Sequence, residues 1–203
     1  YGPRAVYLWR CLQNGLPVHV YGPNWMLNHQ RRATLRAVKL GLQSLIRHPD
    51  RTDTAYRVMN DLVLADIRTN YPGHVHPPLS DEAYHDLLAL SSVVLNFPES
   101  RHGHNFSNPK VLIGANLRDF EVPAAGSLLL TQDNEEIHNF FTPGDEIVTF
   151  RNEWEMTDKA RHYIDHPEEA LRIAKAGHRR AVAEHLWENR LEKLINHLQQ
   201  NIL

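Results

Sequence analysis

A short apolar run bounded by turn residues is the feature that most constrains the fold of this 203-residue chain. Ser127-Leu-Leu-Leu-Thr131 follows a glycine and precedes the polar residues Gln132-Asp-Asn134. Such a run is typical of a strand that is buried on both faces, as in a parallel sheet. Neighbouring parallel strands need crossover connections, which helices commonly supply. The run therefore predicts an α/β fold in which helices flank a parallel sheet.

The segment before this run predicts an anion-binding turn. Residues 118–125 favour a short helix, in which Pro123 is tolerated only in the first turn. The free N–H groups of that helix would face the loop Gly114-Ala-Asn-Leu117. Arg118 adds a planar cation suited to phosphate oxygens, and Glu121 can accept hydrogen bonds from ribose hydroxyls. The alternative is that Arg118 and Glu121 form a surface ion pair three residues apart.

Hydrophobic periodicity and turn residues predict alternating helices and strands along the rest of the chain. Predicted helices cover residues 3–14, 28–47, 54–69, 80–90, 134–141, 153–165 and 167–201. Predicted strands cover residues 17–21, 73–75, 93–97 and 147–150, with a turn at 22–24 and a polar loop at 98–109. In such a sheet, ligands bind beyond the carboxyl ends of the strands.

Several motifs occur in a specific order. They are Gly73-His-Val-His76, Leu79-Ser-Asp-Glu-Ala-Tyr84, Ser91-Ser-Val-Val-Leu-Asn96, Leu117-Arg-Asp-Phe-Glu-Val-Pro-Ala-Ala-Gly126, Phe141-Thr-Pro-Gly-Asp-Glu-Ile-Val148 and Glu188-Asn-Arg190. Together they resemble the C-terminal half of GT-B glycosyltransferases of the spore-maturation, CgeB-like type. Residues 15–25 match the opening of the same half more weakly.

The resemblance implies one Rossmann-like, nucleotide-sugar-binding domain over residues 1–203. A helical insertion would occupy residues 26–72, and a long helix would end the chain. The acceptor-binding N-terminal domain would lie outside this chain, which also begins without methionine and is expected to be a fragment. An apolar stripe on the last helix would be covered by a partner domain of that kind, or would itself cover the sheet of this domain. The insertion could serve oligomerisation or the binding of a partner.

The resemblance also assigns roles to residues of the predicted turn. Glu121 would bind the ribose hydroxyls, while Asn116, Arg118 and the loop at Gly114 would lie near the diphosphate. Ile113 stands eight residues before Glu121, where many glycosyltransferases have a second glutamate. The contact of that glutamate with the donor sugar would therefore be missing or supplied from elsewhere. No catalytic residue is assigned.

Two further segments are expected beside the nucleotide. The backbone around Val75, His76 and Leu79 would meet the base. His104 in the predicted polar loop and Lys110 directly after it are candidates for contacts with phosphate or sugar. For these two residues the alternative is an ordinary solvated side chain.

The function implied by the resemblance is the donor half of a hexosyltransferase. This half would bind a nucleotide-diphosphate sugar and stabilise the leaving diphosphate without a metal ion or another cofactor, for transfer to an unknown acceptor. Alone it would be inactive or weakly active. One alternative is a non-catalytic assembly domain that retains the fold. The other is a zinc-dependent hydrolase with ligands among His74, His76, His102 and His104, but the acidic or cysteine partners of a closed zinc site are absent.

Composition excludes some partners. The net charge of −2 gives no reason to expect a nucleic-acid partner. The single cysteine, Cys11, cannot form an internal disulfide and lies in an apolar stretch, so we expect a core residue and a cytoplasmic protein. No apolar segment is long enough to span a membrane.

Overall fold

The computed structural model describes residues 4–26, 62–98, 100–102 and 110–202. The chain forms two compact units. The N-terminal unit comprises Tyr1–Ser80 and Glu99–Leu112, and the C-terminal unit comprises Asp81–Pro98 and Ile113–Leu203. A single domain over residues 1–203 stays a prediction.

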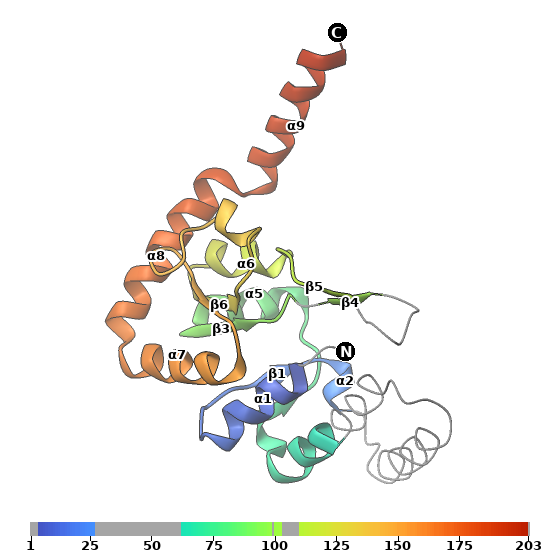
Figure 1. Ribbon diagram of the computed structural model, residues 1–203, viewed down its shortest axis with the longest axis vertical. Helices are drawn as coiled ribbons and strands as arrows, with labels where there is room; N and C mark the ends of the chain where they lie inside the picture. The colour runs from blue at the N-terminus through green and yellow to red at the C-terminus, as the bar shows by residue number, and fades with distance from the viewer. Residues whose placement is uncertain (1–3, 27–61, 99, 103–109, 203) are drawn as a thin grey trace. The chain divides into compact units, whose positions relative to one another are not determined.

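The C-terminal unit is built around a parallel sheet (Figure 1). Its strands are β3 (Val93–Asn96), β6 (Leu128–Gln132) and β7 (Val148–Phe150), with β6 in the centre. Both neighbouring pairs are parallel. The helices of this unit are α5 (Asp81–Leu90), α6 (Arg118–Ala124), α7 (Glu153–Asp165), α8 (Pro167–Glu184) and α9 (Trp187–Ile202). The predicted fold class, a Rossmann-like α/β arrangement with a long C-terminal helix, is confirmed.

The core explains why β6 is apolar along its whole length. All of its residues are buried. Leu129 packs with Val122 of α6 and Ala181 of α8 in one cluster. Leu128 and Leu130 point to the opposite face, because side chains alternate along a strand, and they are also buried. The strand is therefore covered on both faces, as the apolar run predicts.

The N-terminal unit has a smaller core. Its elements are α1 (Arg4–Gln13), β1 (Val20–Tyr21), α2 (Pro23–Met26), the 3-10 helix η1 (Pro72–His74), β2 (Val75–His76), β4 (Ser100–His102) and β5 (Lys110–Leu112). Strands β1 and β2 are parallel, and β4 and β5 are antiparallel. Leu8, Leu12 and Ile67 form the buried cluster. Cys11 is fully buried, and burial raises the pKa of its thiol to about 12, as expected for a core cysteine rather than a nucleophile.

Several predicted elements differ from the structure. The predicted turn at 22–24 continues into α2, because Pro23 suits the first turn of a helix. The predicted helix at 134–141 is reduced to the 3-10 helix η2 (Ile137–Asn139). Strand β4 lies inside the predicted loop at 98–109, and β5 begins directly after that loop. The predicted helix at 28–47 lies outside the described residues. So does the predicted insertion at 26–72, except Met26, which ends α2, and residues 62–72, of which 62–70 are helical.

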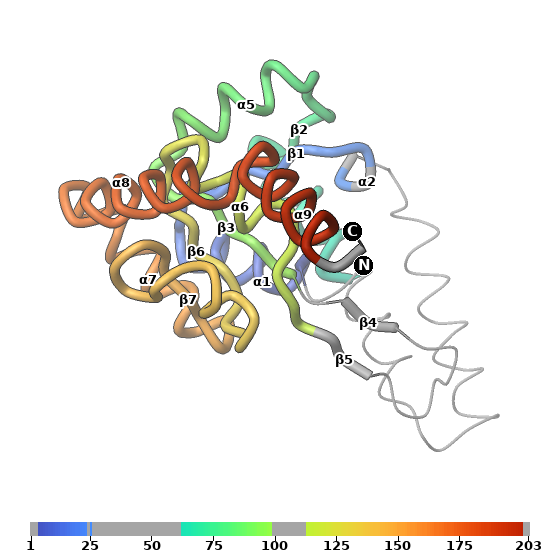
Figure 2. Tube along the Cα trace, turned by 90° about the horizontal axis from the view of Figure 1, so that it is seen from above, coloured from blue at the N-terminus to red at the C-terminus, as the bar shows by residue number. Residues whose placement is uncertain are grey.

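The position of Pro123 also differs from the expectation. It lies in the last turn of α6 rather than the first. Pro123 is buried, and its carbonyl accepts a hydrogen bond from Nδ1 of His178 at 3.2 Å. Helices α6 and α8 pack against each other (Figure 2), so contact with α8 offsets the hydrogen bond that a proline cannot donate.

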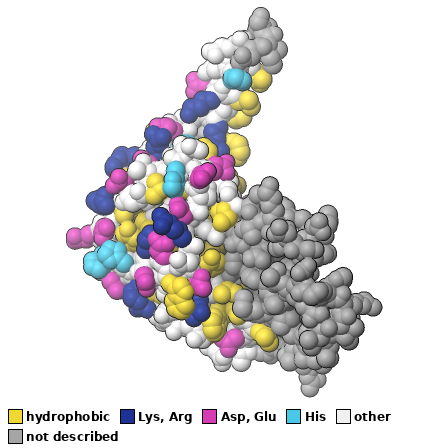
Figure 3. Space-filling view, in the orientation of Figure 1, with side chains coloured by type: hydrophobic (Ala, Val, Ile, Leu, Met, Phe, Trp, Pro, Cys, Tyr) yellow, Lys and Arg dark blue, Asp and Glu magenta, His cyan; other side chains and the backbone are white. Residues whose placement is uncertain are grey.

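The predicted C-terminal helix is divided into α8 and α9, and α9 extends away from the rest of its unit (Figure 1). Apolar side chains are exposed along α9, and hydrophobic atoms gather on one edge of it (Figure 3). They include Leu191, Leu194, Ile195 and Leu198. The exposed apolar stripe is thus confirmed, and what covers it stays a prediction.

Gly177 is needed where α8 crosses the chain that precedes β7. A Cβ atom at this position would overlap the carbonyl oxygen of Glu146. Because the obstacle is backbone, it cannot rotate away as a side chain would. The glycine therefore sets the closest approach between α8 and this segment.

We expect Gly177→Ala to destabilise the protein by about 1–3 kcal/mol, the usual cost of overpacking. Alanine favours a helix interior over glycine by about 1 kcal/mol, so the clash has to outweigh that gain. Urea unfolding measures the difference, with Lys175→Ala at an exposed position of α8 as control. A Gly177→Ala variant as stable as the wild type would show that α8 can move away at no cost.

Candidate functional site

A buried carboxylate organises the edge of the sheet in the C-terminal unit. Asp119 is fully buried. Its Oδ1 accepts hydrogen bonds from Nδ2 of Asn96 and Oγ1 of Thr131, both at 2.7 Å. Its Oδ2 accepts from the backbone N–H of Asn116 at 2.9 Å. Asn96 ends β3 and Thr131 lies in β6, so Asp119 joins the carboxyl ends of both strands to the loop before α6.

Asn116 extends this network to the start of α6. Its Oδ1 accepts from the backbone N–H of Arg118 at 3.0 Å and from Nδ2 of Asn96 at 3.1 Å. The backbone N–H groups of Asn116 and Arg118 are therefore bonded to the protein's own oxygens. They are not the open donors that the sequence led us to expect at this turn.

Glu121 is held by a tyrosine from α5. Oη of Tyr84 donates a hydrogen bond to Oε2 of Glu121 at 2.8 Å. Burial raises the pKa of Tyr84, and the hydrogen bond to Glu121 adds to this effect, so the phenol remains a donor. Among the described residues, no hydrogen bond reaches the other carboxylate oxygen, Oε1. Glu121 therefore presents a fixed acceptor with one oxygen available.

Arg118 lies on the same side of α6. Its Cζ lies 5.5 Å from the centre of the Tyr84 ring, within the range of a cation–π contact. No ion pair between Arg118 and Glu121 is formed among the described residues, which is the opposite of the surface-pair alternative. Tyr84 thus contacts both the guanidinium of Arg118 and the carboxylate of Glu121, and both residues belong to the predicted anion-binding segment.

A second glutamate reaches the same loop. Oε2 of Glu136 accepts from the backbone N–H of Ala115 at 2.9 Å. Sequence reasoning did not select Glu136, because the contact spans 21 residues and belongs to no recognisable motif. Ile113, where a glutamate was considered, is exposed to 37 %.

Lys110 and His104 are the other two residues predicted to contact phosphate or sugar. Lys110 lies on β5, opposite His102 of β4. His104 lies outside the described residues. Contact of either residue with phosphate or sugar therefore stays a prediction.

The candidates for base contact lie in the N-terminal unit. Val75 packs against the cluster that contains Ile67, while Leu79 is half-buried. Nε2 of His76 lies 2.8 Å from Nδ1 of His19, and the His76 ring stacks on Tyr21 with centroids 4.7 Å apart.

The histidines of this unit also bear on the predicted zinc alternative. In His74, Nδ1 lies 2.8 Å from the backbone oxygen of Val18, and the ring stacks on His19 with centroids 5.0 Å apart. Within the described ranges, no group of three or more His, Cys, Asp or Glu residues is arranged to hold a metal ion.

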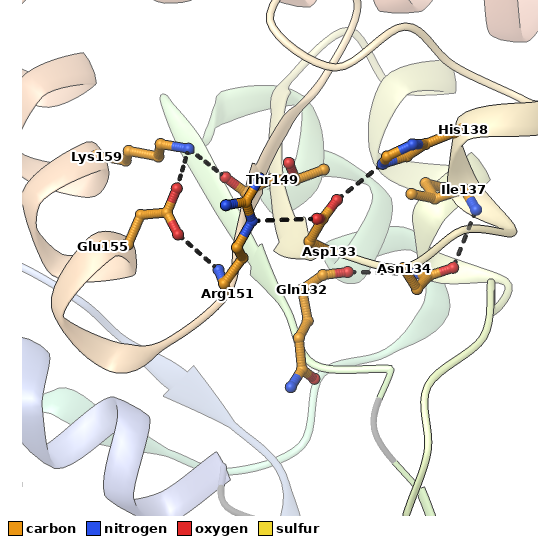
Figure 4. A network of polar contacts seen from close by, with 9 residues as sticks. All are labelled: Gln132, Asp133, Asn134, Ile137, His138, Thr149, Arg151, Glu155 and Lys159. Atoms are coloured by element: carbon orange, nitrogen blue, oxygen red, sulfur yellow. Dashed lines mark hydrogen bonds and ion pairs between the residues drawn. The ribbon is translucent and has the colours of Figure 1, made fainter.

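At the ends of β6 and β7, charged side chains form a network of polar contacts (Figure 4). Asp133 lies 2.8 Å from Nε2 of His138 and 3.6 Å from Nε of Arg151. Nζ of Lys159 donates to Glu155 at 2.7 Å. Burial raises the pKa of Asp133, but contacts with His138, Thr149 and Arg151 lower it below its usual value. Arg151 and Lys159 each have a carboxylate partner in this network. The network therefore stabilises the strand ends and is not a candidate site for binding an anion.

The burial of Asp119 has a consequence for stability against pH. Burial raises its pKa above the usual value, the three hydrogen bonds oppose this shift, and the charge of Glu136 adds to it. A carboxyl group with a raised pKa binds a proton more readily when folded than when unfolded. Its contribution to stability therefore increases as pH falls from neutral toward its unfolded pKa.

We expect the stability of the wild type relative to Asp119→Asn to be greater at about pH 4.5 than at about pH 7.5. The variant cannot titrate at this position, so the difference isolates the carboxyl group. Thermal unfolding at both pH values measures it, with Asp158→Asn at an exposed site of α7 as control. A difference that is constant or larger at the higher pH would contradict the raised pKa.

The chain matches known proteins over most of its length. The model of a family described as glycosyl transferase-like matches residues 5–196. No protein in a curated collection matches the sequence. Among the described residues, no helix has the length and apolarity needed to cross a membrane.

Solved structures with the same fold include HepE from Anabaena. A crystal structure of HepE in complex with UDP has a TM-score of 0.56 and 11 % sequence identity, and the match covers 98 % of this chain and 54 % of that chain. For HepE in complex with UDP-glucose the TM-score is 0.47, at 12 % identity and with 89 % and 48 % covered. The chain thus spans about half the length of HepE.

Proposed function

Because this chain belongs to the glycosyl transferase-like family, we propose that it is the donor-binding half of a metal-independent GT-B hexosyltransferase. It binds a nucleotide-diphosphate sugar and stabilises the diphosphate that leaves during transfer. HepE, which has the same fold at low sequence identity, was crystallised with UDP, and this supports a uridine nucleotide as the first ligand to test.

The observation that carries the proposal is the fixed carboxylate of Glu121. Tyr84 occupies Oε2 at 2.8 Å, and Oε1 is available to accept. A carboxylate held in this way can accept hydrogen bonds from the vicinal hydroxyls of a ribose without first reorganising. The expectation that Glu121 binds the ribose is therefore the part of the site that we propose first.

Arg118 is proposed to attract the diphosphate. Its side chain is exposed, and no carboxylate forms an ion pair with it among the described residues. A guanidinium near the departing diphosphate stabilises the negative charge that develops as the glycosidic bond breaks. Asn116 and Gly114 shape the loop beside it, and Lys110 remains a candidate for phosphate contact.

The remaining parts of the proposal rest on the family resemblance. The base is expected near the backbone of Val75, His76 and Leu79, and His104 is expected beside phosphate or sugar. Because an acceptor site is expected in a partner domain, we expect this half alone to transfer little sugar. A cytoplasmic location remains a proposal that rests on the single cysteine.

We expect UDP to bind the wild type and Glu121→Ala to weaken binding by about tenfold to a hundredfold, as for loss of a charged hydrogen bond. Isothermal titration calorimetry measures the dissociation constants. The ribose contact is tested with 2′-deoxy-UDP, which should bind the wild type more weakly than UDP and bind Glu121→Ala about as well as UDP does.

Glu82→Ala, at an exposed position of α5, is the matched control and should bind UDP as the wild type does. If Glu121→Ala still discriminates between the two nucleotides, Glu121 does not bind the ribose. If the wild type binds no nucleoside diphosphate, the proposed function is wrong, as the non-catalytic assembly alternative predicts.

A further inference from the structure

Glu136 is a carboxylate fixed on the loop beside the proposed donor site. Its Oε2 lies 2.9 Å from the backbone nitrogen of Ala115. A methyl group on Gly114 would lie 2.8 Å from the same oxygen, so the carboxylate occupies space that exists because residue 114 is glycine. No hydrogen bond within the described residues reaches Oε1.

Two hydrogen bonds and a buried neighbouring residue hold the backbone at Glu136 in place. Ile137, the next residue, is fully buried in the main cluster of the C-terminal unit. Its N–H donates to Oδ1 of Asn134 at 3.0 Å, and the carbonyl of Glu136 accepts from the N–H of Asn139 at 3.1 Å. The side chain of Glu136 thus starts from a fixed point, and no lysine, arginine or histidine of the described residues forms an ion pair with it.

The charges around this position select the kind of ligand that fits it. The carboxylate of Glu136 acts on Asp119 as a second negative charge at the same loop. A phosphate bound at the N–H of Ala115 would meet this negative potential and compete with Glu136 for that donor. Neutral hydroxyl groups would instead donate to Oε1, because an ionised carboxylate is an acceptor only.

We propose that Glu136 accepts a hydrogen bond from a hydroxyl group of the sugar carried by the nucleotide. The proposal rests on the function proposed above and assigns to this side chain the recognition of a polyhydroxylated group. Glu121 then binds the ribose of the donor, and Glu136 binds the sugar that is transferred.

The test compares UDP with UDP-sugars. Calorimetry gives the dissociation constants of the wild type for UDP, UDP-glucose, UDP-galactose and UDP-N-acetylglucosamine, and the UDP-sugar that binds most tightly is taken forward. We expect it to bind more tightly than UDP. In Glu136→Ala this advantage should fall by about tenfold, while the affinity for UDP stays unchanged.

Two further variants separate the contact from general damage to the loop. Gly114→Ala keeps every charge but displaces the carboxylate, so it should also lose the advantage of the UDP-sugar. Glu135→Gln removes an adjacent exposed charge and should behave as the wild type. Thermal unfolding of each variant shows whether the fold is retained.

Each other outcome overturns the inference. If no UDP-sugar binds the wild type more tightly than UDP, Glu136 has no sugar to recognise. If Glu136→Ala binds UDP more tightly, the side chain competes with phosphate instead. If the wild type binds neither UDP nor a UDP-sugar, the proposed function and the inference are both wrong. If the variants bind UDP normally and still bind the UDP-sugar more tightly than UDP, as the wild type does, only the inference is wrong.

Discussion

The fully buried carboxylate of Asp119 ties together β3, β6 and the loop before α6 through hydrogen bonds to Asn96, Thr131 and the backbone of Asn116. Burying a carboxylate without partners costs several kcal/mol of folding free energy, which is a large part of the stability of a typical domain. The loop must therefore keep the conformation in which all these donors reach Asp119. The start of α6, and with it the direction of Arg118 and Glu121, follows from this requirement.

Two carboxylates are associated with this fixed loop, one in the helix that follows it and one bonded to its backbone, and each is held by one oxygen. Tyr84 holds Glu121, and the N–H of Ala115 holds Glu136. In each case the second oxygen faces no hydrogen-bond donor of the described chain. Side chains that are fixed before a ligand arrives lose little entropy on binding, which is the physical advantage of such a site. Asp119, in contrast, is saturated and inaccessible, so its role is to position the loop.

The sequence predicted the elements whose signals are local. The apolar run gave β6 to within one residue, and the predicted helix at 153–165 has the bounds of α7. The resemblance to a glycosyltransferase-type domain was carried by ordered motifs and is confirmed by the family match. The position of Pro123 in the last turn of α6 was not predicted. It depends on packing against α8, and helix propensities give no information on such tertiary contacts. The open amides expected before α6 were misjudged because Asn116 folds back onto Arg118.

Glu136 was missed for a related reason. It belongs to a stretch that was predicted as a helix but forms only a 3-10 turn, and its partner lies 21 residues earlier in the chain. Motif reasoning favoured Glu121, because it lies in a segment with a family resemblance. It assigned no role to Tyr84, although this residue belongs to another of the motifs, because Tyr84 reaches Glu121 from a different helix. Residue types and spacing thus indicated one carboxylate, and the tertiary structure added the groups that fix and complement it.

The most direct test of the central claim is a crystal structure of the protein with UDP. The account predicts ribose hydroxyls within hydrogen-bonding distance of Oε1 of Glu121, while Tyr84 keeps its contact with Oε2. The diphosphate should lie on the side of Arg118. UDP bound elsewhere, or bound with Glu121 turned away from the ribose, would contradict it.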